Sequence, residues 1–281
     1  MERNLQLRIL TALTLGIAFI GAIYWSAYTA IALFSLILVL GLYEFFNLCS
    51  AINPEVKPNR SLAIVLSLSL FGMLSILPGM IKLNMLFPRD YFLCLAALFV
   101  VILGIFCIEL FRNKHKPFEN MAAIFMGAVY LAIPLGLIVS SSVDADGSYQ
   151  PWNILYFFFF MWAADTGAYF VGKFAGKRKL FERLSPKKTV EGFLGGMLAS
   201  ALLGWLAFTH LGTMGLPQWL GIGILLSITG TAGDLFESML KRQAGIKDSG
   251  SILPGHGGIL DRFDSALLSA PVYWMILYLA L

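Results

Sequence analysis

The chain has 281 residues, of which 58% are hydrophobic and 13% charged, and its mean hydropathy is +0.79. Soluble domains carry about a quarter charged residues, so the composition excludes an ordinary soluble protein. The formal net charge is only +4, and the three cysteines, Cys49, Cys94 and Cys107, follow neither a disulfide framework nor a metal-binding spacing.

Apolar runs of about twenty residues, the length at which a helix crosses about 30 Å of hydrocarbon, recur along the sequence. Barrel strands would be shorter and would alternate in polarity, so we expect an all-α polytopic membrane protein with about nine transmembrane helices. The expected spans are Leu7–Trp25, Tyr28–Leu48, Leu62–Ile81, Tyr91–Phe111, Phe118–Ser140, Pro151–Val171, Val190–His210, Pro217–Leu240 and Ser265–Leu281.

We divide the chain into an N-terminal transmembrane bundle of about five helices, residues 1–150, and a catalytic transmembrane region, residues 151–281. The Phe157–Phe160 run is expected to face lipid.

Lysine and arginine indicate the orientation, because they remain on the cytoplasmic side of short loops. With the N-terminus inside, eighteen of the twenty cations fall on inside segments, and only Lys82 and Arg89 fall outside. The sequence therefore predicts a cytoplasmic N-terminus, an outside C-terminus, and cytoplasmic loops at 172–189 and 241–264. We expect a multi-pass protein of the cell's inner (cytoplasmic) membrane, with a site that faces the cytoplasm and attracts anionic lipid and nucleotide.

The densest polar stretch begins near the inner end of the eighth span. Asp234, Glu237, Ser238 and Lys241 are spaced i, i+3, i+4 and i+7, so they share one helix face. Asp234 lies about 25 Å along a helix that begins at Pro217, and an ionisable residue at that depth marks a functional site by default. For Glu237, a plain interfacial ion pair with Lys241 is the alternative.

The loop that follows has parts suited to phosphate chemistry. Residues 254–258 read Pro-Gly-His-Gly-Gly, which permits tight turns whose free N–H groups can cradle phosphate oxygens. Asp261 and Asp264 follow in this loop, and carboxylates bind Mg²⁺ together with nucleotide phosphates. Countercharge is available from Lys241, Arg242, Lys247 and Arg262. A basic loop that merely binds lipid headgroups would explain these cations, but it would explain neither the aspartates nor the glycines.

A long pattern in this region resembles the signature of the phosphatidate cytidylyltransferases, also called CDP-diglyceride synthases. It reads Ser238-x-Leu240-Lys241-Arg242-x4-Lys247-Asp248-x-Gly250-x2-Leu253-Pro254-x-His256-Gly257-Gly258-Ile259-x-Asp261-Arg262-Phe263-Asp264. A weaker resemblance covers 165–170 and 185–192, whereas residues 1–150 resemble the family only as a run of spans.

The resemblance implies a helical bundle with a cytoplasm-facing site, in which CTP and phosphatidic acid give CDP-diacylglycerol and pyrophosphate with a divalent cation, Mg²⁺. A second cation could use Asp264 or Glu237. The residues expected to be catalytic are Asp234, Asp261, Lys241, Arg242 and His256. The residues expected to bind substrate are Ser238, Lys247, Asp248, Gly257, Gly258, Arg262, Lys187 and Lys188. The residues expected to bind metal are Asp234, Asp261 and Asp264.

The expected partners are CTP, phosphatidic acid and membrane lipid, without nucleic acid. A homodimer is compatible with the sequence, which does not define the oligomeric state. We expect the basic 172–189 loop, with Lys187 and Lys188 near the membrane surface, to draw in the lipid headgroup.

Three other features of the sequence could belong to a site or could have a purely structural role. Gly167-x4-Gly172-Lys173 imitates a phosphate-binding P-loop, but Phe174 follows it and the glycines lie in an apolar span. Gly192-x3-Gly196 is expected to let helices approach closely. Asp165 lies in an apolar run, and both site support and an interhelical hydrogen bond remain open for it.

Glu44, Glu109 and Glu119 fall at inner span ends, where an interfacial role is the expectation.

The alternative functions are another CTP-dependent lipid enzyme, such as a CDP-archaeol synthase or a polyprenol or phytol kinase, and a transporter. A transporter would show two similar halves with interrupted spans, which the sequence lacks.

Overall fold

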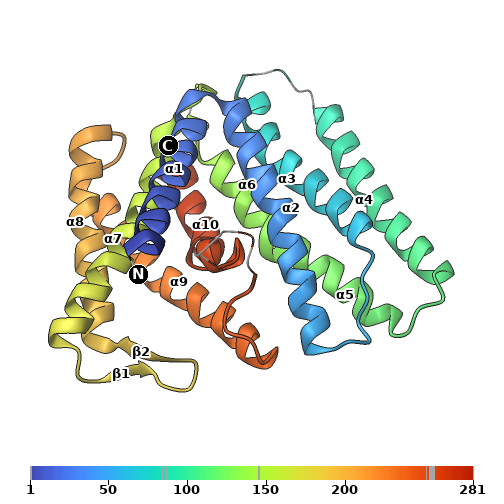
Figure 1. Cartoon of the computed structure of the whole chain (residues 1–281). Helices are drawn as coiled ribbons and strands as arrows, with labels where there is room; N and C mark the ends of the chain where they lie inside the picture. The colour runs from blue at the N-terminus through green and yellow to red at the C-terminus, as the bar shows by residue number, and fades with distance from the viewer. Residues whose placement is uncertain are drawn as a thin grey trace.

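The computed structural model of the chain is a helical bundle with a small β-hairpin at one end (Figure 1). It describes residues 2–83, 85, 88–144, 146–250, 252 and 257–280, with side chains from residue 13 onward except at 81, 82, 88 and 91. The helices are α1 (Glu2–Trp25), α2 (Ala27–Ile52), α3 (Arg60–Lys82), α4 (Pro88–Phe111), α5 (Pro117–Gly127), the π-helical η1 (Ala128–Ala132), α6 (Ile133–Ser140), α7 (Pro151–Ala175), α8 (Val190–Leu211), α9 (Leu216–Gln243) and α10 (Leu260–Ala280). The strands are β1 (Lys179–Phe181) and β2 (Ser185–Thr189).

Within the described residues, eight helical stretches are long and apolar enough to cross a membrane, and α1 adds a shorter apolar stretch. Helix α5, η1 and helix α6 count as one of these, because they follow one another as a continuous span, Pro117–Ser140. The expectation of an all-α polytopic protein with about nine transmembrane helices is therefore confirmed.

The connections alternate between the two ends of the bundle, as the distribution of cations requires. The hairpin, the 53–59 and 112–116 connections and the inner end of α9 all lie at one end, at the bottom of Figure 1. The 212–215 turn lies at the opposite end. All the cation-rich connections thus share one face of the protein.

Two boundaries differ from the expectation. Helix α10 begins at Leu260, so Asp261 and Asp264 lie in its first turns and not in a loop that reaches residue 264. The 172–189 segment is also more ordered than expected, because α7 continues to Ala175 and the antiparallel hairpin of β1 and β2 follows. Acidic residues in the first turn of a helix are favoured by its dipole, which explains why α10 can begin on this charged stretch.

The expectation that Phe157–Phe160 faces lipid is wrong. Phe157, Phe158 and Phe160 are buried, and their rings contact Tyr273, Phe19 and Trp219, which lie in α10, α1 and α9 respectively. Apolar side chains suit a helix interface in a membrane as well as they suit lipid, so hydrophobicity alone does not show which face is buried.

Glycines allow α7, α8 and α9 to pack with their backbones close together. A Cβ atom at Gly196 would lie 2.7 Å from the carbonyl oxygen of Ala164, and one at Gly192 would lie 2.8 Å from that of Ala168. Between α8 and α9, Gly204 and Gly223 each face a backbone carbonyl of the other helix. The expected close approach at Gly192-x3-Gly196 is confirmed, and it determines the spacing of the helices that surround the site.

A buried polar cluster joins α4 to the start of α5. Glu109 is 2% exposed and accepts hydrogen bonds from Arg112 at 2.7 Å and from Asn120 at 2.8 Å. Asn120 also accepts the backbone N–H of Lys57 at 2.7 Å. Glu109 is therefore a buried structural residue and not the interfacial one that its position suggested, whereas Glu119 is partly exposed and pairs with Lys116 at 3.7 Å.

Substitution of two glycines tests the close packing. Gly196→Ala would force its Cβ against the α7 backbone, and overpacking of this kind costs about 1–3 kcal/mol. Gly221→Ala is the matched control, because nothing lies within 4 Å of its added Cβ and alanine favours helix by roughly 1 kcal/mol. Thermal unfolding of the detergent-solubilised variants should place Gly196→Ala below wild type and Gly221→Ala at or above it. Equal stability of the two variants would contradict the packing argument.

Candidate functional site

The hairpin is anchored to the beginning of α8. The Glu191 carboxylate accepts the backbone N–H groups of Lys177 at 2.9 Å and Arg178 at 3.1 Å. Thr189 caps α8, because its hydroxyl accepts the N–H of Gly192 at 3.1 Å. These contacts hold the end of β2 against the helix and so position the two lysines that precede Thr189.

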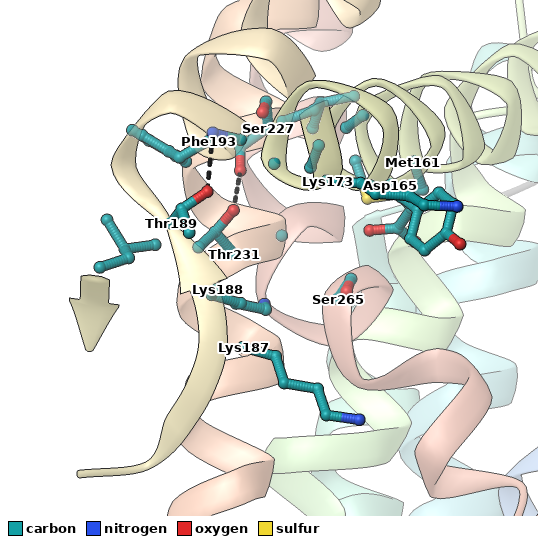
Figure 2. A pocket seen from close by; sticks show the side chains of 18 residues that line it. Met161, Asp165, Lys173, Lys187, Lys188, Thr189, Phe193, Ser227, Thr231 and Ser265 are labelled. Carbon is teal, nitrogen blue, oxygen red and sulfur yellow. Dashed lines mark hydrogen bonds between the residues drawn. The ribbon is translucent and has the colours of Figure 1, made fainter. Parts of the chain in front are cut away.

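A cavity of about 360 Å³ opens between α7, α8 and α9, next to the hairpin. Its apolar wall includes Met161, Phe193 and Leu226, which belong to the membrane-spanning helices. Figure 2 shows Lys187 and Lys188 extending from the hairpin toward the side where Ser265 of α10 lies. The cavity therefore has a cationic rim at the end of the bundle and an apolar interior.

Lys188 connects the rim of the cavity to the polar face of α9. Its ammonium group forms an ion pair with Asp234, and both side chains are about 30% exposed. Ser238, one turn further along α9, donates its hydroxyl to the other oxygen of Asp234 at 3.3 Å. Asp234 is therefore held between the hairpin and its own helix.

A second lysine joins α9 to α10. Lys241 contacts Asp261 at 2.6 Å and Glu237 at 3.1 Å. The interfacial ion pair considered for Glu237 does exist, but it is part of a three-residue cluster that includes the predicted metal ligand. Glu237 is fully buried, and one of its carboxylate oxygens has no hydrogen-bond partner within the described part of the chain.

Backbone groups of the signature segment hold the other oxygen of Asp261. This oxygen accepts the N–H of Gly258 at 2.8 Å, the N–H of Ser249 at 2.9 Å and the hydroxyl of Ser249 at 3.0 Å. Gly257, just before, has a φ of +84°, a conformation that glycine adopts without strain. Ser249 and Gly258 therefore bind the same carboxylate, whose charge strengthens each of these hydrogen bonds.

Asp264 lies one turn further along α10, where α10 touches α9. A Cβ atom at Gly233 would collide with the backbone carbonyl of Asp264, so only glycine allows this approach. The Asp264 carboxylate accepts the N–H of Ser265 at 2.6 Å and interacts electrostatically with Asp234 and Glu237. The carboxylates that the sequence places 30 residues apart thus converge through a glycine contact.

Asp165 belongs to the same region. It lines the cavity and interacts electrostatically with Lys188, Asp234 and Asp264. Of the two alternatives left open by the sequence, these contacts favour support of the site.

The carboxylates of this region supply the oxygen ligands that Mg²⁺ prefers, and Glu237 adds a buried oxygen without a partner. Their chemistry therefore fits a divalent cation. In this arrangement, however, no three acidic, histidine or cysteine side chains of the described residues converge as a ready metal site. Asp234 and Asp261 are instead neutralised by Lys188 and Lys241.

Comparison with known proteins identifies the family. The sequence profile of the cytidylyltransferase family matches residues 6–280. The chain belongs to this family. It is similar to proteins named phosphatidate cytidylyltransferase in three bacteria. The Bacillus subtilis protein is 39% identical over 217 residues, which cover 72% of this chain and 79% of the relative. The Synechocystis protein is 33% identical over 301 aligned residues, which cover 95% of this chain and 93% of the relative. The Staphylococcus aureus protein is 42% identical over 168 residues, which cover 59% of this chain and 62% of the relative.

The enzyme is accordingly a CTP-dependent nucleotidyltransferase of the membrane. Not all of its predicted site residues come together. Lys247 and Asp248 are exposed beyond the end of α9, and Arg262 is exposed on α10. Arg242 is exposed and donates to the carbonyl of Ile246 at 3.3 Å. His256 lies outside the described residues.

The sequence did not place Glu44 beside the predicted site residues, although the structure does. Its side chain is 2% exposed, and its carboxylate accepts the N–H of Leu260 at 2.9 Å. The same oxygen lies 3.2 Å from the hydroxyl of Ser249, whose single proton serves either Glu44 or Asp261. The interfacial role expected for Glu44 is therefore wrong. The available signal was a lone carboxylate in an apolar run, which marks function by default.

Proposed function

We propose that the enzyme makes CDP-diacylglycerol from CTP and phosphatidic acid and releases pyrophosphate, with its site on the cytoplasmic face of the cell's inner membrane. One observation carries the choice of a lipid substrate. The cavity has lysines at its rim and apolar side chains from membrane-spanning helices inside, and one of those lysines pairs with the carboxylate cluster. Such a cavity suits a molecule with an anionic head and an apolar body. The names of the relatives support the same substrate.

The reaction needs positioning more than strong acid or base. The phosphate of phosphatidic acid is already an anionic nucleophile, so its oxygen attacks the α-phosphorus of CTP in line while the bond to pyrophosphate breaks. Holding two anions together in that geometry is the main barrier, and fixed cations lower it. Lys187 and Lys188 hold the lipid phosphate at the rim of the cavity. Lys241, which contacts Asp261 and Glu237, holds the triphosphate.

Asp234, Asp261 and Asp264 are the residues that would hold Mg²⁺, and Glu237 or Asp264 would hold a second cation. Bound Mg²⁺ neutralises charge that develops on the transferring phosphoryl group.

The lysines have two roles in this scheme. Lys188 and Lys241 form ion pairs with Asp234 and Asp261. In the reaction, the same ammonium groups bind phosphate oxygens of the substrates.

The cation distribution supports the cytoplasmic orientation. Eighteen of the twenty lysines and arginines lie on the segments assigned to the inside, and the connections among these segments share one end of the bundle (Figure 1). That end also carries the hairpin beside the cavity. CTP therefore reaches the site from the cytosol.

One assay tests the activity and the orientation together. Sealed inverted and right-side-out membrane vesicles containing the protein receive labelled CTP and phosphatidic acid. We expect a labelled CDP-lipid at once in inverted vesicles, but only after permeabilisation in right-side-out vesicles, because CTP does not cross the bilayer. Product in intact right-side-out vesicles would overturn the orientation. Label transferred to an isoprenoid lipid but not to phosphatidic acid would overturn the proposal that phosphatidic acid is the lipid substrate.

Asp234→Asn and Asp261→Asn test the proposed metal ligands. Each change is nearly isosteric but removes a ligand charge, so each should lower kcat on the order of 10²-fold, as loss of a preorganised electrostatic group does. If both act through one cation, the double variant should be little worse than either single variant. Asp146→Asn, in the connection between α6 and α7, is the control. Normal turnover at limiting Mg²⁺ would show that the altered residue is not a ligand.

Lys187→Ala combined with Lys188→Ala tests the lipid-phosphate site. We expect the apparent KM for phosphatidic acid to rise more than the KM for CTP, because the lysines lie at the rim of the cavity. Lys177→Ala with Arg178→Ala removes the same charge from the same connection but changes no residue that lines the cavity. If both double variants change lipid kinetics equally, the lysines act only through net charge.

A further inference from the structure

Glu44 is a buried carboxylate in α2 to which the proposed reaction assigns no role. One oxygen accepts the N–H of Leu260 and lies 3.2 Å from the hydroxyl of Ser249, and the other has no hydrogen-bond partner among the residues that the structure describes. Burying a carboxylate is unfavourable unless it is compensated, and an apolar side chain would suit this helix better. Its place in the fold therefore requires an explanation beyond packing.

Glu44 is connected to the predicted metal ligand through a single residue. The hydroxyl of Ser249 lies 3.2 Å from Glu44 and 3.0 Å from the Asp261 oxygen that also accepts the Gly258 N–H. The other oxygen of Asp261 contacts Lys241 at 2.6 Å. A continuous polar path therefore runs from α2 to the carboxylate cluster between α9 and α10.

Two glycines of the signature leave the space that this carboxylate occupies. A Cβ atom at Gly258 would lie 2.5 Å from one Glu44 oxygen. A Cβ atom at Gly250 would overlap the other oxygen and lie 2.7 Å from Glu44 Cδ. The atoms nearest to Gly250 all belong to Glu44. Its lack of a side chain is thus explained by a residue more than 200 positions away.

We propose that Glu44 is a positioning residue, which holds the described ends of the 249–260 segment, residues 249–250 and 258–260, so that Asp261 faces Lys241. The effect on turnover rests on the proposed function, whereas the effect on the segment does not. The carboxylate acts as a fixed acceptor for groups at both ends of the segment. It does not contact substrate.

Hydrogen exchange of the full-length protein tests the positioning directly. Glu44→Ala should speed amide exchange in peptides covering 249–260 and leave the other spans unchanged. Glu44→Gln keeps an acceptor oxygen of the same reach and should retain protection. Glu109→Gln changes another glutamate that is 2% exposed, but its hydrogen-bond partners are Arg112 and Asn120 and not the described residues of this segment, so it should leave the segment protected. Unchanged exchange in Glu44→Ala would overturn the proposal.

Kinetics then separate positioning from a purely structural role. Glu44→Ala should lower kcat by roughly 10- to 100-fold, as loss of an outer-shell partner does, and raise the Mg²⁺ concentration needed for half-maximal rate. Glu44→Gln should recover most of the activity. A Glu44→Gln variant as slow as Glu44→Ala would overturn positioning through the acceptor oxygen.

A double-mutant cycle tests the link to the glycine. Gly250→Ala should disturb the wild-type segment because its Cβ meets Glu44, but it should add little in the Glu44→Ala background, where that space is empty. Additive effects would overturn the link. If the wild-type protein makes no CDP-lipid, the proposed function fails, while the exchange measurements still decide the role of Glu44.

Discussion

Charge at the edge of the hydrocarbon must be compensated, and the site is built around that requirement. An unpaired carboxylate at this depth is costly, so each acidic residue at the inner ends of α9 and α10 needs partners from elsewhere in the chain. Lys188 of the hairpin compensates Asp234, and Lys241 of α9 compensates Asp261 of α10. The same pairs fix the hairpin and both helices relative to one another. A partly buried pair of this kind is weak evidence for stability, but it specifies one arrangement of the three elements.

Close contact between backbones is the second condition for this site. Gly233 allows the backbone of α10 to reach α9 at Asp264, and Gly192 and Gly196 bring α8 against α7 beside the cavity. Without a hydrophobic force between helices in lipid, small residues determine where helices meet. The glycines therefore fix the distances across which the charged side chains act.

The sequence predicted what depends on neighbouring residues and missed what depends on distant ones. The spans were predictable because hydrocarbon thickness fixes helix length. The signature was recognisable because its residues follow one another. The ion pair between Lys188 and Asp234 was not predictable, although both residues had been selected. The role of Glu44 depends on Leu260, 216 positions away.

The start of α10 was misplaced because charged residues were assigned to a loop, although they suit the first turn of a helix.

The size of the cavity has a consequence for how the enzyme meets its lipid. At about 360 Å³, it lies near the lower limit of ordinary ligand pockets, roughly 300–1,000 Å³, and has room for only a small part of the apolar body of a lipid with two long acyl chains. The greater part of the chains of the proposed substrate therefore remains among neighbouring lipids during the reaction. Substrate and product then exchange by lateral diffusion in the leaflet, without passing through water. The quantity that governs saturation is the mole fraction of phosphatidic acid in that leaflet, and diluting it with inert lipid slows the enzyme even when its bulk concentration is constant.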